Sequence, residues 1–181
     1  MRYIAVSILI LLITNISIAQ QYVPVDEGSE IEFKVRNFGI NVKGDFTGLK
    51  GTIVFSEDHL TEAHFDVTIE VNTINTGINQ RNNHLLSESF LEVSKYPLMR
   101  FESIKITKST NKDYLYMFGK LTIKDVTKEI SFPFKAMPDN GDYIFVGELS
   151  LNRRDYHVGE NSLTMSDNVK VSLKVRAKAV K

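Results

Sequence analysis

The feature that most constrains this chain is an alternation of apolar and polar residues that returns in segment after segment. Segment 62–71 shows it most clearly, with Phe65, Val67 and Ile69 between polar neighbours. Successive side chains of a strand point to opposite faces, so this period of two predicts strands with one buried face. The pattern recurs at 30–36, 40–46, 53–55, 114–123, 130–136, 143–151, 169–177 and, less evenly, from Leu98 onward.

Short polar turns join most of these segments. Asp139-Asn140-Gly141-Asp142 is the strongest, since Asn-Gly accepts the positive φ angles of a hairpin turn. Short connections favour antiparallel neighbours. With no run of helices to cover the apolar faces, the sheet must close on itself or split into two layers. The sequence therefore predicts an all-β fold, a single antiparallel barrel of about eight strands, with a bulge near Glu102-Ser103 where the alternation slips.

The segment Thr73–Ser103 interrupts the alternation and predicts one irregular or short-helical crossing segment. A connection of this length is often functional. Arg81 and His84 lie three residues apart within it, so one helical turn would bring them onto one face. The arginine could bind a polar or anionic head group. Alternatively, both side chains pin the segment through backbone carbonyls, and the sequence leaves both interpretations open.

The N-terminus carries the pattern of a secretory signal peptide. A basic Arg2 precedes an apolar run from Tyr3 to Ile16, and small residues lead to Ala19. We expect a signal peptide at 1–19, a single barrel domain at 20–181, and a periplasmic or secreted mature protein. The chain has no cysteine and a net charge near zero, which excludes thiolate chemistry and gives no general attraction to nucleic acid.

Catalytic and metal-binding patterns are absent from the sequence. The four histidines, His59, His64, His84 and His157, are dispersed and form no metal-ligand spacing. No nucleophile–base pair can be argued. We therefore expect a protein that is not an enzyme and holds no metal. The inward positions of the strands are nearly all apolar, which fits either a packed core or an apolar tunnel.

Ordered motifs along the chain resemble the YceI-like family of bacterial periplasmic, polyisoprenoid-binding proteins. They are Thr76-Gly77, Arg81-x-x-His84-Leu85, Ser89-Phe90, Lys95-Tyr96-Pro97, Phe101-x-Ser103, Gly119-x-Leu121-Thr122-Ile123-x-x-Val126-Thr127-Lys128 and Asn152-Arg153-x-Asp155-Tyr156-x-Val158. Ser29, Phe33, Gly44, Phe46, Gly51 and Ile53 fit at the front.

This resemblance implies a lipocalin-like barrel with an elongated apolar cavity that binds long isoprenoid chains, such as quinone tails or polyprenyl lipids, outside the cytoplasm. It favours the tunnel over the packed core, and it implies binding without catalysis. No cofactor is expected other than a bound isoprenoid lipid or quinone. Expected ligand-binding residues are Phe33, Val35, Phe46, Phe55, Phe65, Val67, Leu121, Phe132, Phe134, Phe145 and Leu149 in the walls, with Arg81, His84 and Phe90 at the mouth.

Three positions depart from the family pattern. Asn37 stands where a histidine commonly follows the first strand, Asn82 where an aspartate follows the arginine, and His157 where a glycine follows the aromatic residue. A head-group preference therefore does not transfer from other members to this chain.

The second hypothesis is a filled barrel that acts as an extracytoplasmic interaction or stress-response protein. Tyr114, Tyr116 and Phe118 lie on the polar side of one segment, where they would suit a homodimer contact.

Overall fold

The structure, a computed structural model, describes residues 20–180. The predicted signal peptide, 1–19, lies outside these residues. Nine strands, one helix and two 3₁₀ turns follow one another along the chain. They are β1 (Gln20–Asn37), β2 (Ile40–Phe46), β3 (Lys50–Phe55), β4 (His64–Glu70), η1 (Val71–Thr73), α1 (Asn79–Leu86), β5 (Leu98–Lys108), β6 (Leu115–Ile123), β7 (Val126–Asp139), β8 (Asp142–Asn152), η2 (Arg153–Tyr156) and β9 (Met165–Ala179).

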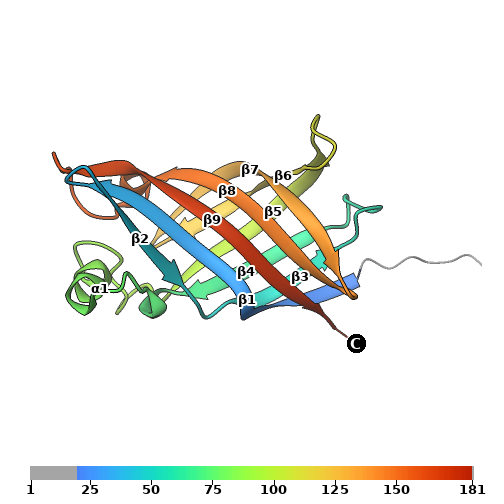
Figure 1. Cartoon of the computed structure of the whole chain (residues 1–181), viewed down its shortest axis with the longest axis horizontal. Coiled ribbons are helices and arrows are strands. Elements are labelled where there is room, and N and C mark those ends of the chain that lie inside the picture. The colour runs from blue at the N-terminus through green and yellow to red at the C-terminus, as the bar shows by residue number, and fades with distance from the viewer. Residues whose placement is uncertain (1–19, 181) are drawn as a thin grey trace, which may run out of the picture.

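The strands form one antiparallel sheet that closes into a barrel. Its order is β2-β1-β3-β4-β5-β6-β7-β8-β9, and β1 also pairs with β9. Eight strands therefore complete the ring, which confirms the predicted fold class. The long β1 changes partner along its length, because Gln20–Tyr22 pair with β3 whereas Ile31–Asn37 pair with β2. Figure 1 shows the tilted strands and α1 beside one end of the barrel.

The first strand begins about ten residues earlier than the alternation predicts. Its register against β9 shifts between Val25 and Glu30, where Gly28 has φ +79°. At this shift the Ser29 side chain takes the place of a backbone acceptor, because its Oγ accepts a 2.8 Å hydrogen bond from the Arg176 backbone N–H. A bulge breaks the period of two, which is why the sequence pattern hides this half of the strand.

The bulge predicted near Glu102-Ser103 is present. The register between β5 and β6 shifts between Ser103 and Lys105. The Ser103 hydroxyl is buried and accepts a 2.8 Å hydrogen bond from the Phe65 backbone N–H of β4. The serine thus supplies an acceptor to a buried donor, which would otherwise be costly.

The crossing segment runs from the end of β4 to β5 and lies against β2. The backbone groups of Asn75 and Asp45 exchange hydrogen bonds of 2.9 and 3.0 Å, and the Val71 N–H donates to the Pro97 carbonyl. These contacts place α1 at the barrel end where β2 replaces β3 as the neighbour of β1. No helix within residues 20–180 is long and apolar enough to cross a membrane.

Candidate functional site

The two halves of the barrel interior are filled differently. At the end formed by β3 and the β7–β8 turn, aromatic rings pack against one another and leave little space. Phe55, Phe65, Phe134 and Phe145 are all at most 6 % exposed, with ring centroids 5.0–6.3 Å apart. Tyr143 closes this end with its ring 5.1 Å from that of Phe55. Aromatic packing of this kind makes a solid core.

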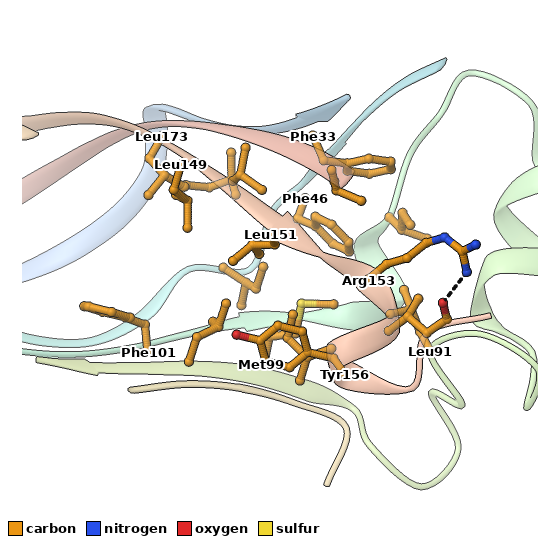
Figure 2. A pocket seen from close by; sticks show the side chains of 18 of the residues that line it. Phe33, Phe46, Leu91, Met99, Phe101, Leu149, Leu151, Arg153, Tyr156 and Leu173 are labelled. Carbon is orange, nitrogen blue, oxygen red and sulfur yellow. Dashed lines mark hydrogen bonds between the residues drawn. The ribbon is translucent and has the colours of Figure 1, made fainter. Parts of the chain in front are cut away.

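The other half is hollow. It holds a cavity of about 260 Å³ with an almost wholly apolar wall (Figure 2). The side chains come from every strand except β3, from the crossing segment, and from the turns and loops at this end. They include Ile31, Phe33, Val35, Phe46, Leu49, Val67, Ile69, Ile74, Leu85, Phe90, Leu91, Met99, Phe101, Leu121, Ile123, Ile130, Phe132, Leu149, Leu151, Tyr156, Val158, Met165, Val169, Val171, Leu173 and Val175. The barrel therefore contains both a packed core and an apolar cavity.

Strand alternation explains why so few polar groups reach the cavity. Its border also includes Glu32, Thr68 and Arg100. These residues occupy outward positions, and Arg100 ion-pairs there with Asp66 at 2.7 Å and with Glu102 at 3.2 Å. Only their backbone can face the interior, because neighbouring positions on a strand point to opposite faces.

The crossing segment covers the hollow end. Ile74 and Leu91 are 5 % and 6 % exposed and form a second core cluster with Tyr156. Phe90 lines the cavity and lies against Gly159, in the loop before β9. Lys124, in the β6–β7 turn, adds polar contacts, because its Nζ lies 3.7 Å from Glu92 Oε2 of the crossing segment and donates to the His157 carbonyl at 3.2 Å. Thus the segment is held by apolar contacts inside and by polar contacts at its rim.

Arg81 and His84 lie on the outside of this cover and not in the cavity wall. Arg81 donates from Nε to the Thr76 hydroxyl at 2.9 Å and from Nη2 to the Thr76 carbonyl. The ring of His84 contacts Phe90 edge-on at 4.7 Å. Asn82, where the family pattern has aspartate, accepts hydrogen bonds from both the backbone N–H and the hydroxyl of Thr76. The Arg81 contacts match the interpretation in which this residue pins the segment through a backbone carbonyl, whereas His84 contacts the Phe90 ring instead.

Arg153 is a buried structural cation beside the cavity. It is 5 % exposed, and it donates to the Val158 carbonyl at 2.8 Å and to the Ser166 carbonyl at 3.2 Å. Its Nη2 lies 2.7 Å from Asp167 Oδ1 without the angles of a hydrogen bond, so this contact is an ion pair. Burial lowers the pKa of Arg153. In Figure 2 the guanidinium points away from wall residues such as Leu151.

Tyr156 supplies the polar group that the cavity wall does contain. Its side chain is 2 % exposed, and burial raises its pKa to about 12. Figure 2 shows its hydroxyl directed toward the Phe101 side of the cavity, with no hydrogen bond to the lining residues drawn there. A phenol in such a place remains neutral, so it can donate a hydrogen bond to a ligand or accept one from it.

The expected ligand-binding residues thus fall into three groups in space. Phe33, Val35, Phe46, Val67, Phe90, Leu121, Phe132 and Leu149 line the cavity. Phe55, Phe65, Phe134 and Phe145 belong to the packed end, and Arg81 and His84 lie outside the wall. Sequence reasoning missed Tyr156, Leu91 and the β9 positions Val169, Val171 and Leu173 as wall residues, although the alternation of β9 and the Asp155-Tyr156 motif carried the signal.

The outward aromatic residues of β6, and Tyr114 just before it, are partly covered. Rings of Tyr116 and Phe118 lie 5.4 Å apart, Lys105 Nζ lies 4.7 Å over Phe118, and Lys135 Nζ lies 4.5 Å over Tyr114. The homodimer contact expected here stays a prediction. Within the described residues, no three histidine or acidic side chains gather in a way that could hold a metal ion.

Comparison with known proteins agrees with this architecture. The YceI-like domain family matches residues 22–177. Protein YceI of Salmonella arizonae is 31% identical over 136 residues, which cover 74% of this chain and 70% of that protein. The crystal structure of Burkholderia cenocepacia BcnA has a TM-score of 0.78 at 19% identity, over 83% of this chain and 96% of that one.

Two further solved structures are similar. The YCEI protein of Campylobacter jejuni has a TM-score of 0.70 at 28% identity, covering 78% of this chain and 87% of that one. A polyisoprenoid-binding domain from Saccharophagus degradans has a TM-score of 0.69 at 14% identity, covering 91% of this chain and all of that one, and it shares the fold. The extent of the family match and the identity to Protein YceI establish that the chain belongs to the YceI-like family.

Proposed function

We propose that the protein binds a long-chain isoprenoid-type lipid in the hollow half of the barrel, for transport or storage outside the cytoplasm, and that it does so without catalysis. The observation that carries this proposal is the apolar cavity beneath the crossing segment. The polyisoprenoid-binding domain that shares the fold supports the class of ligand.

The energetics of the cavity suit an apolar chain. Apolar surface removed from water contributes roughly 25 cal/mol per Å², before the cost of immobilising the ligand is subtracted. An unbranched or isoprenoid tail presents almost only such surface, and the wall offers it almost only aliphatic and aromatic partners. A charged ligand would instead lose its hydration without finding a counter-charge, because Arg153 already binds two carbonyls and Asp167.

Lipid content tests the proposal directly. The mature protein would be purified without detergent, and native mass spectrometry followed by lipid extraction would identify what co-purifies. Separately, lipid-free protein would be offered a polyprenol and a ubiquinone. We expect one apolar ligand per chain; a protein that carries no lipid and cannot be loaded with either probe would contradict the proposal.

A cavity-filling variant gives the matched test. Leu149→Trp places a large ring in the wall of the cavity and should abolish loading, whereas Ile104→Trp adds the same ring at a 51 % exposed site and should not. Cell fractionation with and without residues 1–19 tests the extracytoplasmic location. Equal loading of both tryptophan variants would place the ligand elsewhere.

A further inference from the structure

The β1–β2 turn exposes an aromatic residue where turn chemistry disfavours one. Phe38 and Gly39 form the two-residue connection, with φ +49° and +77°. Both angles are positive, as in a type I′ hairpin, for which Asn-Gly is the preferred pair. A bulky residue at positive φ is costly. Phe38 is also 75 % exposed, so packing inside this chain does little to offset that cost.

Two more exposed apolar side chains share this end of the barrel. The Phe38 N–H donates to the Thr164 carbonyl at 2.9 Å, so the loop before β9 lies beside the turn. Leu163 in that loop is fully exposed, and Ile40 is 69 % exposed. We call Phe38, Ile40 and Leu163 the apolar tip. Single exposed apolar residues are ordinary, but a group of them indicates an interaction site.

A row of lysines crosses three neighbouring strands near the tip. Lys34 of β1 is directly opposite Lys43 of β2 on one side and Lys170 of β9 on the other. Like charges directly opposite one another in a sheet are destabilising. Neither these lysines nor Arg36, closer to the tip, has a carboxylate within 4.0 Å among residues 20–180. We call Lys34, Lys43 and Lys170 the cationic row.

Along β1 and β2 the charge changes sign with distance from the tip. The next outward pair along the same strands is acidic, Glu32 opposite Asp45. The cationic row is therefore a local feature of this face, between the apolar tip and an acidic pair.

The tip, the row and the cavity meet at one end. Val35 and Met165 line the cavity, and they lie within a few residues of Phe38 and Thr164. In Figure 1 the β1–β2 turn, the loop before β9 and α1 share the end opposite the C-terminus. Exposed apolar residues beside cations suit the boundary between anionic head groups and acyl chains.

From this arrangement we propose that the hollow end docks on an anionic lipid bilayer, with the apolar tip inserted and the cationic row against the head groups. Docking in this orientation brings the crossing segment and the cavity beneath it to the bilayer surface. The exchange of lipid at that surface rests on the proposed function, whereas the docking itself does not.

Vesicle flotation tests the docking. The mature protein would be mixed with vesicles of phosphatidylglycerol and phosphatidylcholine in equal parts, or of phosphatidylcholine alone. We expect the protein to float with the anionic vesicles, less so at high salt, and much less with the neutral ones. Phe38→Asn combined with Leu163→Ser should lower the partition coefficient about tenfold or more. Asn-Gly is the preferred turn, so this variant should fold at least as stably.

Charge variants provide the matched control. Replacing Lys34, Lys43 and Lys170 by Gln should weaken binding to anionic vesicles by about fivefold per lysine. Replacing Lys108, Lys112 and Lys120, which lie on strands and a turn across the barrel from β1, should leave it within about twofold. Equal losses in both triple variants, or equal flotation with neutral vesicles, would overturn the proposal.

Two further measurements distinguish membrane docking from self-association through the tip, and docking from lipid loading. Sedimentation of lipid-free protein reports self-association, and a dimer that Phe38→Asn abolishes would assign the tip to a second copy of the chain instead. Loading from detergent micelles should proceed normally in the tip variant. A wild-type protein that floats but cannot be loaded refutes only the carrier function; one that loads but does not float refutes only the docking.

Discussion

Phe90 of the crossing segment packs against Gly159 of the loop before β9, so closely that a Cβ on residue 159 would lie 2.7 Å from Phe90 Cε1. Gly159 also has φ +67°, which side chains disfavour. The absence of a side chain at this position therefore lets an aromatic residue of the cavity wall reach its place. Through this contact, two segments far apart in the sequence close the same end of the barrel.

Gly159→Ala should destabilise the fold through both the clash and the backbone. We expect the free energy of unfolding to fall by about 2–4 kcal/mol, measured by urea denaturation. Gly77→Ala is the matched control, since Gly77 has φ +77° and no atom within 4 Å of a Cβ built there. It should lose only the backbone part, about 1 kcal/mol. If the two variants lost the same amount, the contact with Phe90 would be unimportant.

The raised pKa of Tyr156 makes stability depend on alkaline pH. The folded protein holds this proton more tightly than the unfolded chain, because the pKa is about 12 in the folded state against the ordinary value of 10.0. The stabilisation is therefore complete below pH 10 and is lost as the pH rises toward 12, by roughly 2 kcal/mol. Tyr156→Phe should flatten this part of the stability curve.

Two other tyrosines also contribute to the loss of stability at alkaline pH and provide a reference for the Tyr156 variant. Tyr22 and Tyr143, at the packed end, also have raised pKa values, chiefly because they are buried. Some alkaline loss should therefore persist in Tyr156→Phe. A variant with the same loss as the wild type between pH 10 and 12 would mean that Tyr156 titrates in the folded state as it does in water.

Tyr156 should also distinguish ligands by their head groups. Figure 2 shows its hydroxyl directed toward the Phe101 side, among apolar wall residues. Tyr156→Phe should weaken the binding of a ubiquinone, whose carbonyl can accept a hydrogen bond, by about threefold to tenfold. The binding of squalene, which has no polar atom, should be unchanged or slightly stronger. Titration by fluorescence quenching measures both, and an equal loss for both ligands would show a packing effect instead.

The strand pattern was readable from sequence because burial on one face imposes a period of two. It predicted the barrel, the crossing segment and even the bulge, where Glu102 and Ser103 break the phase. The same pattern could not separate Phe33, which lines the cavity, from Phe55, which packs the solid end. Both are inward aromatic residues, and only the three-dimensional arrangement of the rings decides whether space remains between them.

The backbone conformation of Phe38 and the pairing of the lysines could not be predicted from the sequence, for a related reason. Phenylalanine is not a residue type that predicts positive φ, and the lysines of the cationic row are on three strands whose pairing the sequence does not give. These lysines come together only through the strand register, which an alternation of apolar and polar residues does not determine. The motif around Arg153 and Tyr156 was recognised, yet its position beneath the cavity required the structure.

Arg153 provides the last prediction, because its carbonyl contacts and its ion pair can be separated. Arg153→Met keeps much of the volume but leaves the Val158 and Ser166 carbonyls without their donor, and should lower the free energy of unfolding by about 3 kcal/mol. Asp167→Asn removes the charge from a 42 % exposed partner and should cost about 1 kcal/mol or less. Urea denaturation of both variants, at low and high salt, decides between them. Similar losses that shrink in high salt would assign the stabilisation to the ion pair, whereas a larger, salt-independent loss in Arg153→Met assigns it to the buried hydrogen bonds that hold the loop before β9 against the cavity.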